Sequence, residues 1–318
     1  MLRRLAAPLT LFFLTPLIAE YLLGSLPMSM IALLPLMSAM YGSAAIIIRE
    51  VVRSSERGWP SIVLLAIAYG FFEEGIVTQS LFNPNYLHLH LLNFGWLPEL
   101  GTALPWLVFV ITTHVAWSIC VPIGFTEALF PREERKPWLT SVGMIVFPLL
   151  LLAGSALVAI FSYKQVPFIA SPLQFCVVVA LIIALTCAAL AWPRAARLQA
   201  RNAPGPLVLF GASFLAGSAM QLLKHYGPIW HLSWPEAVAA VSGVAIAFVL
   251  FMVIFTRGRT WNATQRWALM AGALLVYVWC GFGADISLHG SAGIGAHAIL
   301  AAVIVLLAGF AGFRAKRA

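Results

Sequence analysis

The chain has 318 residues, of which 62% are hydrophobic and only 9% are charged, and its formal net charge at pH 7 is +8. Soluble domains carry roughly 25% charged residues, so this composition excludes an ordinary soluble globular protein. In lipid, a spanning segment must satisfy its own backbone hydrogen bonds, so unbroken apolar runs of about 20 residues predict an all-α, polytopic transmembrane helical bundle.

Apolar runs of spanning length follow one another along the chain. The first follows Arg3 and Arg4 and has the look of a signal peptide, but no small-x-small cleavage site follows it, so we interpret it as the first span. We expect residues 1–318 to form a single integral membrane domain of about ten spans. The predicted spans are 5–23, 29–48, 60–82, 104–126, 139–161, 173–192, 206–223, 236–256, 267–284 and 293–313.

The basic residues between these spans fall almost entirely on one side of the membrane, the exceptions being Lys164 and Lys224. The positive-inside rule therefore places both termini in the cytoplasm, in a multi-pass protein of the cytoplasmic (inner) membrane. The net positive charge is thus explained by the orientation of the spans in the membrane. No dedicated basic domain is left for nucleic acid, and membrane lipid is the expected partner. The residues that set the orientation are Arg3, Arg4, Arg49, Arg53, Arg57, Arg132, Arg135, Lys136, Arg194, Arg197, Arg201, Arg257, Arg259, Arg266, Arg314, Lys316 and Arg317.

The third predicted span contains two adjacent acids, Glu73 and Glu74. A charged side chain at the centre of a bilayer costs at least about 3 kcal/mol, and an ionisable residue inside a membrane is a functional-site hypothesis by default. The structural alternative is a buried pair that locks helices together through hydrogen bonds.

The stretch 83–103 is the one long external loop, and it is apolar and punctuated by Pro84, Gly95, Pro98 and Gly101. A loop of this length in a compact fold is usually functional. We expect it to form a short interfacial helix or a re-entrant cover over the glutamates.

The fourth predicted span places a histidine level with the glutamates. His114 lies ten residues after Leu104, or roughly 15 Å into the membrane, and Glu74 lies eight residues before Phe82, or roughly 12 Å, at about 1.5 Å per residue. Side chains at similar depth on consecutive antiparallel spans are candidates for one shared site. Neighbouring helical residues point about 100° apart, so only one glutamate is expected to face His114 directly.

Further polar side chains near the ends of these spans are candidates for substrate binding. Glu127 lies at the cytoplasmic end of the fourth span, where we expect it to pair with Arg132 or Arg135 or to line an inner gate. The candidate substrate-binding residues are Thr78, Gln79, Asn83, Thr113, Ser118 and Glu127.

The remaining ionisable residues near the external ends of spans are expected in contact with water. Glu20 and Asp285 lie there, and so do several histidines, including His289 and His297. A metal site built from a glutamate, His114 and one external histidine is an alternative. Because the chain contains no His-Glu-x-x-His motif, we expect no metal and no other cofactor.

Two carboxyl groups this close together in a low dielectric do not both ionise easily. A carboxyl group beside an imidazole suits general acid–base chemistry on a water molecule, and it also suits proton-coupled transport. Two functions therefore stay open: an intramembrane hydrolase, and a proton-coupled secondary transporter or lipid-linked carrier with Glu73 or Glu74 as the titrating group. The transported or cleaved substrate would be a peptide or a small molecule.

The stretch FFEEGIVTQSLF followed by VITTH resembles the CAAX-protease and bacteriocin-processing family of intramembrane endopeptidases. That family carries Glu-Glu-x-x-x-Arg at the end of one span and Phe-x-x-x-His on the next. The resemblance implies that Glu73 or Glu74 is the base that activates a water, and that His114 is its partner, in peptide-bond hydrolysis. All three are therefore candidate catalytic residues.

The chain departs from that pattern at defined positions. Thr78 stands in place of the motif arginine, Val110 in place of the phenylalanine, and the fifth span has no histidine for the third motif. The chain also looks like a group of uncharacterised bacterial and archaeal multipass proteins that have a similar Glu-Glu-Gly stretch.

Overall fold

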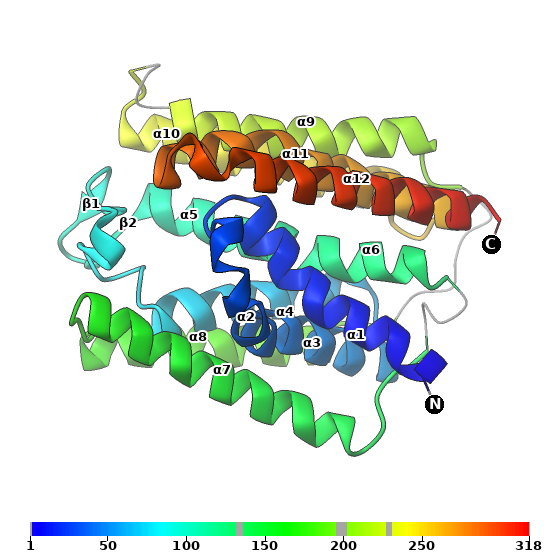
Figure 1. The fold of residues 1–318 in the computed structure, drawn as a ribbon, viewed down its shortest axis with the longest axis horizontal. Coiled ribbons are helices and arrows are strands. Elements are labelled where there is room, and N and C mark those ends of the chain that lie inside the picture. Colours follow the sequence, from blue (N-terminus) through cyan, green and yellow to red (C-terminus); the bar gives the residue numbers. More distant parts are fainter. Residues whose placement is uncertain (1, 132–135, 195–201, 227–230, 318) are drawn as a thin grey trace.

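The computed structural model describes residues 2–131, 136–194, 202–226 and 231–317 (Figure 1). Ten helical segments within them are long and apolar enough to cross a membrane, which confirms the predicted all-α fold. Four basic residues used for the orientation, Arg132, Arg135, Arg197 and Arg201, lie outside the described residues. The ten segments are Leu5–Leu22, Met28–Ser54, Trp59–Val77, Leu104–Leu129, Gly143–Gln165, Pro172–Ala191, Pro206–Lys224, Trp234–Thr256, Ala263–His289 and Ser291–Lys316.

The α-helices of the described chain are α1 (Leu2–Pro16), α2 (Leu34–Met37), α3 (Ser43–Ser54), α4 (Trp59–Phe72), α5 (Leu104–Thr113), α6 (Val121–Leu129), α7 (Gly143–Gln165), α8 (Pro172–Ala191), α9 (Pro206–Tyr226), α10 (Trp234–Thr256), α11 (Ala263–His289) and α12 (Ile294–Lys316). Several spans in the first half change to π-helix part-way. These π-helical segments are η1 (Leu17–Leu22), η3 (Ser38–Gly42), η4 (Glu73–Val77) and η6 (His114–Cys120). The described chain also contains short 3₁₀ segments: η2 (Met28–Leu33), η5 (Tyr86–His88) and η7 (Ser291–Gly293).

The sequence marks where many of these helices begin. Helices α4, α5, α8 and α10 carry a proline in their first turn, where its missing N–H costs nothing. Ser171, Ser233 and Asn262 form capping boxes at the starts of α8, α10 and α11, which satisfy backbone donors that have no intrahelical partner. The positions of these helix starts are therefore determined by the local sequence and do not depend on tertiary packing.

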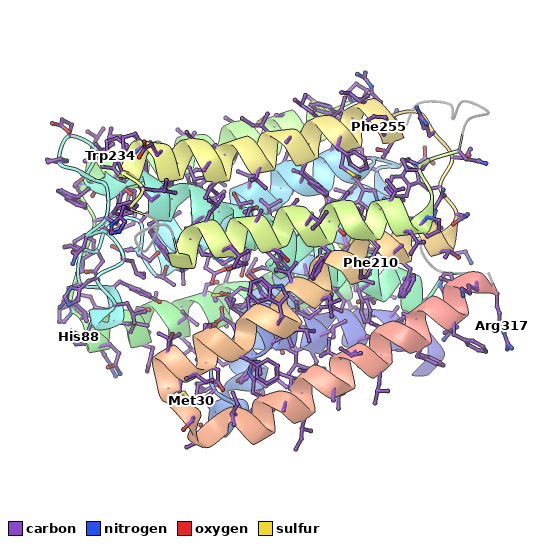
Figure 2. All side chains as sticks on the ribbon, turned by 90° about the horizontal axis from the view of Figure 1, so that it is seen from above. Met30, His88, Phe210, Trp234, Phe255 and Arg317 are labelled. Atoms are coloured by element: carbon purple, nitrogen blue, oxygen red, sulfur yellow. The ribbon has the colours of Figure 1, made fainter. Side chains whose placement is uncertain are left out.

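Both termini lie at one end of the bundle, which we call the terminal end (Figure 1). The opposite, hairpin end carries β1 (Trp96–Leu97) and β2 (Thr102–Ala103), which pair antiparallel with Trp96 opposite Ala103. Figure 2 shows His88 and Trp234 at the hairpin end and Arg317 at the terminal end. Termini at one end agree with an even number of spans, while the side of the membrane on which they lie stays a prediction.

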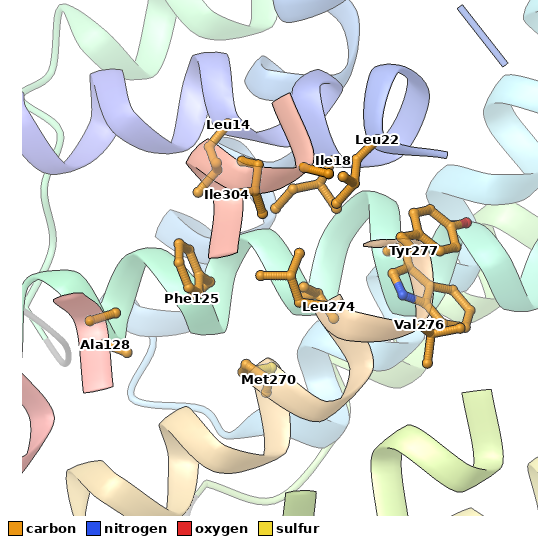
Figure 3. Packing of buried hydrophobic residues seen from close by; sticks show 14 of the residues in the cluster. Leu14, Ile18, Leu22, Phe125, Ala128, Met270, Leu274, Val276, Tyr277 and Ile304 are labelled. Atoms are coloured by element: carbon orange, nitrogen blue, oxygen red, sulfur yellow. The ribbon is translucent and has the colours of Figure 1, made fainter. Parts of the chain in front are cut away.

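Apolar side chains from distant parts of the chain form the main core between α1, η1, α6, α11 and α12 (Figure 3). Trp117 stacks on Tyr277 with ring centroids 4.5 Å apart, and its Nε1 donates to the carbonyl of Ala273 at 2.8 Å. Such a pair buries a large apolar area and still satisfies the indole N–H. This core fixes η6, and therefore His114, relative to the second half of the chain.

Helices α7, α8 and α10 contribute few side chains to the interior and expose long rows of Leu, Ile, Val and Phe. In a soluble protein, apolar patches of this size would cause aggregation, whereas in a bilayer they contact lipid tails. The exposed faces of these three helices are consistent with an integral membrane protein.

Candidate functional site

The two glutamates and the histidine lie on π-helical segments of consecutive spans. Glu73 and Glu74 begin η4, and His114 begins η6. Gly70 lets these spans approach closely, because a Cβ atom on it would lie only 3.3 Å from the His114 Cβ. Pro122 follows η6 and has no N–H for a regular helical bond, which favours an irregular turn before it. Single-turn π segments occur often at functional sites.

Glu74 is hydrogen-bonded on both carboxylate oxygens. Its Oε1 lies 2.7 Å from His114 Nε2, and its Oε2 accepts from Ser80 and, at 3.1 Å, from Thr78. The Trp106 indole N–H donates to Ser80 Oγ at 3.1 Å. The indole is a donor only and takes up one lone pair of Ser80 Oγ, which leaves the Ser80 hydrogen available for Glu74. The direction of these bonds therefore favours an ionised Glu74 that holds the imidazole in place.

Glu73 contacts the same imidazole from the other side. Its Oε2 lies 3.4 Å from His114 Nδ1 and has no hydrogen-bond partner, although Glu73 is only 2% exposed. Ser118 Oγ also lies 3.0 Å from Nδ1. Only Glu74 is hydrogen-bonded to the imidazole, as expected for neighbouring helical residues, and Glu73 bonds to Tyr41 instead. The π-helical turn still brings Glu73 close to His114, because side chains diverge less there than on an α-helix.

A third acid joins this group through a tyrosine. The Tyr41 hydroxyl bonds to Glu20 Oε1 and to Glu73 Oε1, and the Ser25 hydroxyl donates to Glu20 Oε2. A hydroxyl has one hydrogen, so it can donate to only one of the two carboxyl groups. The other must carry a proton and donate it to the tyrosine oxygen. We call Glu20, Tyr41, Glu73, Glu74 and His114 the acid–histidine network.

The prediction that Glu20 contacts water near an outer span end is wrong. It is half-buried and bonded within the protein. The available signal was an acid inside an apolar run, the same signal that identified Glu73 and Glu74. Tyr41 and Tyr69 were also missed, and their rings each lie 6.1 Å from the His114 ring. These rings exclude water from two sides of the imidazole.

Three predicted substrate-binding residues line one small cavity of about 10 Å³ between the end of η4 and the end of α7: Thr78, Gln79 and Asn83. This is close to the smallest space that holds a water molecule. Thr78 also bonds to Glu74, so the cavity adjoins the network. The Gln79 side chain accepts from the backbone N–H of Ala170 at 2.7 Å, which ties the loop between α7 and α8 to this place.

The other predicted substrate-binding residues do not line this cavity. The Thr113 hydroxyl donates to the carbonyl of Val110 at 2.8 Å, within its own helix, and Ser118 bonds to His114. Glu127 lies 13 residues beyond His114, or roughly 20 Å along the span at 1.5 Å per residue. It belongs to the terminal end.

Glu127 bonds there to two arginines of α3. Arg49 Nε lies 3.1 Å from its Oε1, and Arg53 Nη2 lies 2.8 Å from its Oε2. Arg49 also contacts Glu50 at 3.5 Å and stacks on the Trp138 ring at 3.4 Å. We call Arg49, Glu50, Arg53 and Glu127 the arginine lock. The predicted partners Arg132 and Arg135 lie outside the described residues.

Two residues expected at a wet interface are buried instead. Asp285 is 2% exposed and His297 is 1% exposed, because the turn around Gly24 packs tightly onto the end of α11. Their side chains lie 3.9 Å apart, Asp285 Oδ2 to His297 Nδ1. The depth of a residue along its helix did not indicate which neighbour would cover it.

The long external loop contains the single 3₁₀ turn η5 and the β1–β2 hairpin in place of the predicted interfacial helix or re-entrant cover. Leu92, Thr102 and Ala103 anchor it because they are buried. Tyr86 of η5 is close enough to the network for burial, together with the nearby Glu74 charge, to raise its pKa.

One metal-ligand constellation stands out among the described residues: Glu73, Glu74 and His114 each offer an atom within 4.8 Å of the others. However, the carboxylates face different nitrogens of one imidazole, and a single ion binds only one nitrogen of a ring. The arrangement therefore suits proton sharing better than chelation.

Comparisons with known proteins identify a family for the chain but no activity. No curated protein and no solved structure gives a significant match. The matching family model is not that of the CAAX proteases, so the likeness to them is limited to the short motifs. The model that does match covers residues 9–316, and the chain therefore belongs to a family described as an uncharacterised membrane protein family.

Proposed function

We propose that the protein is an intramembrane peptidase in which Glu73 and His114 activate a water molecule. The observation that carries the proposal is a buried imidazole between two carboxylates with different bonding. Glu74 is bonded on both oxygens, whereas Glu73 Oε2 is buried without a hydrogen-bond partner. A free acceptor beside a fixed imidazole is the arrangement that general-base catalysis on water needs.

In the proposed mechanism Glu73 Oε2 accepts a proton from the water, and the water oxygen attacks the substrate carbonyl carbon. His114, charged and held at Nε2 by Glu74, turns its Nδ1–H from Ser118 to the oxygen on which negative charge develops and donates a hydrogen bond to it. Collapse of the tetrahedral intermediate breaks the bond to the leaving group, which takes the proton from Glu73. This transfer restores the charge of Glu73, so the proton shared through Tyr41 stays on Glu20 during the cycle.

The position of the network supports a substrate that enters from the membrane. Glu73 and Glu74 are buried in the last turn of the third span, which ends at Val77 and not at residue 82 as predicted. The adjacent cavity has room for one water and is lined by Thr78, Gln79 and Asn83. An apolar transmembrane peptide, as the short motifs suggest, would reach this depth from lipid.

Membranes of cells that express the wild-type protein or single variants test the proposal by mass spectrometry of peptide termini. Glu73→Gln, Glu74→Gln and His114→Gln should each reduce protein-dependent new termini by roughly 10²–10⁴-fold, the usual contribution of general acid–base catalysis. Glu236→Gln is the matched control, because Glu236 lies at the exposed start of α10. Full cleavage in the network variants would sink the proposal.

One observation favours a proton-coupled transporter as a second candidate. A hydrogen-bonded series links Ser25, Glu20, Tyr41 and Glu73, and His114 Nδ1 lies 3.4 Å from the end of it. Such a series stores and passes protons. At the terminal end, the arginine lock is fully paired and offers no comparable acceptor. Sealed proteoliposomes under a pH gradient distinguish the candidates: a transporter moves substrate or protons, and Glu73→Gln abolishes the flux.

A further inference from the structure

Tyr69 is a buried tyrosine of α4 to which the mechanism above gives no chemical role. Its side chain is 5% exposed, and its hydroxyl oxygen is buried without a hydrogen-bond partner among the described residues. Buried polar atoms in native proteins nearly always have a partner, and an exception is often part of a functional site. The position of this hydroxyl therefore needs an explanation.

Tyr69 lies one helical turn before Glu73, on the same face of the third span. The backbone N–H of Glu73 bonds to the Tyr69 carbonyl, so the α-helical turn between them is intact, and side chains at i and i+4 on a helix are neighbours. Of the charged groups around the Tyr69 hydroxyl, Glu73 interacts with it most strongly, ahead of Glu20 and Glu74. The hydroxyl therefore faces the acid–histidine network.

The Tyr69 ring is held in this direction by two other rings of the site. Its centroid lies 6.0 Å from that of Tyr41 and 6.1 Å from that of His114. The Tyr41 and His114 rings are themselves 6.1 Å apart. Aromatic rings at such separations are in packing contact. Because each of the three rings packs against the other two, the Tyr69 hydroxyl has little freedom to turn toward another partner.

The nearest polar groups already bond elsewhere. The Tyr41 hydroxyl bonds to the other oxygen of Glu73, Oε1, and the Ser118 hydroxyl bonds to His114. Glu73 Oε2 is consequently a buried acceptor without a partner, and the Tyr69 hydroxyl is a buried donor without one. A donor and an acceptor that belong to adjacent turns and do not bond to each other are typically bridged by an ordered water molecule.

We propose that the Tyr69 hydroxyl and Glu73 Oε2 together bind one water molecule and, resting on the proposed function, that this water is the one that attacks the substrate. The water accepts the Tyr69 hydrogen on one lone pair and donates a hydrogen to Glu73 Oε2. Its second lone pair is left to form the bond to the carbonyl carbon. The O–H bond to Glu73 breaks as that bond forms, and Tyr69 keeps its own hydrogen throughout. Tyr69 is thus a further catalytic residue.

The cleavage assay of peptide termini tests this role with a matched pair of variants. Tyr69→Phe should reduce protein-dependent new termini at least tenfold. Its unfolding temperature should stay unchanged or rise, because the lost hydroxyl bonds to no protein group. Tyr21→Phe is the control, because the buried Tyr21 donates to the carbonyl of Met30 at 3.0 Å. It should lower the unfolding temperature and leave cleavage unchanged.

A cryo-EM structure of the wild type that resolves ordered waters tests the site without any variant or substrate. A water peak at about 2.5–3.0 Å from both Tyr69 Oη and Glu73 Oε2 supports the proposal. A direct hydrogen bond between these two atoms, with no water bound to either, overturns it. The peak should be lost in the structure of Tyr69→Phe, and a peak retained there would show that Glu73 holds the water without Tyr69.

The cleavage and cryo-EM experiments separate this inference from the proposed function. Full cleavage by Tyr69→Phe, together with loss of cleavage in Glu73→Gln, overturns the role of Tyr69 and leaves the peptidase standing. A wild type that binds the bridging water and cleaves no peptide confirms the water site, and it overturns the peptidase and the catalytic role of Tyr69 together. Loss of both the water and the cleavage in Tyr69→Phe supports the whole proposal.

Discussion

The acid–histidine network and the arginine lock are both buried groups of charged side chains on the first six helices, and they are built in opposite ways. In the arginine lock, two arginines meet two glutamates, so the charges balance. In the network, three glutamates surround one histidine, so the acids outnumber the base. A balanced cluster stabilises a fold, whereas an excess of acid can persist only if protons are held within it.

Hydrogen bonding shows the same contrast. Glu127 is bonded on both oxygens by arginine, whereas Glu73 keeps a buried oxygen without a partner. The segments differ as well: the lock arginines lie on regular α3, while the network residues lie on or beside π-helical turns. Unsatisfied groups and irregular helices are costly for stability, and such costs are concentrated at functional sites. We therefore expect the arginine lock to stabilise the fold and the acid–histidine network to carry out the chemistry.

The largest effect on stability is expected at the lock. Glu127→Gln removes the charge that pairs with both Arg49 and Arg53 and leaves Glu50 as the one acid of the lock. Breaking a buried ion pair by removing one partner costs about 3–5 kcal/mol. Chemical denaturation in detergent measures this loss. A change below about 1 kcal/mol would mean that the arginines find other partners and that the lock is not structural.

A smaller loss is expected for Tyr41→Phe. The substitution removes the hydroxyl that bonds to Glu20 and Glu73 and leaves a buried carboxyl oxygen of Glu73 and a half-buried one of Glu20 without this partner, at about 1–3 kcal/mol. Thr10→Val is a suitable control, because the Thr10 hydroxyl bonds only to a carbonyl in its own helix. Equal stability of Tyr41→Phe and wild type would argue against a shared proton at Tyr41.

Removal of the hydroxyl at Ser118 should cost about 0.5–1.5 kcal/mol, the net worth of one hydrogen bond. Ser118→Ala deletes the bond to His114 Nδ1, so the imidazole is oriented by the carboxylates alone. Turnover should fall while the affinity for substrate stays the same. Ser118→Thr, which restores a hydroxyl, should recover part of the rate. An unchanged rate in Ser118→Ala would remove this residue from the mechanism.

The smallest effect on stability, and the sharpest contrast with Glu127, is expected for Glu73→Gln. The same isosteric change here removes one acid from a cluster that has too many, so stability should change by less than about 1 kcal/mol or rise. Activity should nevertheless be lost. Paired denaturation curves for Glu73→Gln and Glu127→Gln test the comparison, and equal destabilisation of the two variants would break it.

The sequence was sufficient for the spans, the paired glutamates and the histidine, because apolar run length and residue depth depend on one helix at a time. It was insufficient for Glu20, Tyr41 and the lock partners of Glu127. Those contacts depend on how neighbouring helices are rotated about their axes, and π-helical turns change that rotation without a clear local signal. The burial of Asp285 was missed for a related reason, since the loop at Gly24 that covers it is far away in the sequence.

Infrared spectroscopy tests the central claim, that the network holds a proton at neutral pH. Tyr41 has one hydrogen between two carboxyl groups, so either Glu20 or Glu73 must be protonated. The wild-type protein at pH 7 should therefore show the carbonyl stretch of a buried protonated carboxyl group. That band should disappear in both Glu20→Gln and Glu73→Gln and remain in Glu127→Gln. A wild-type spectrum without the band, or a band lost only in Glu127→Gln, would contradict the account.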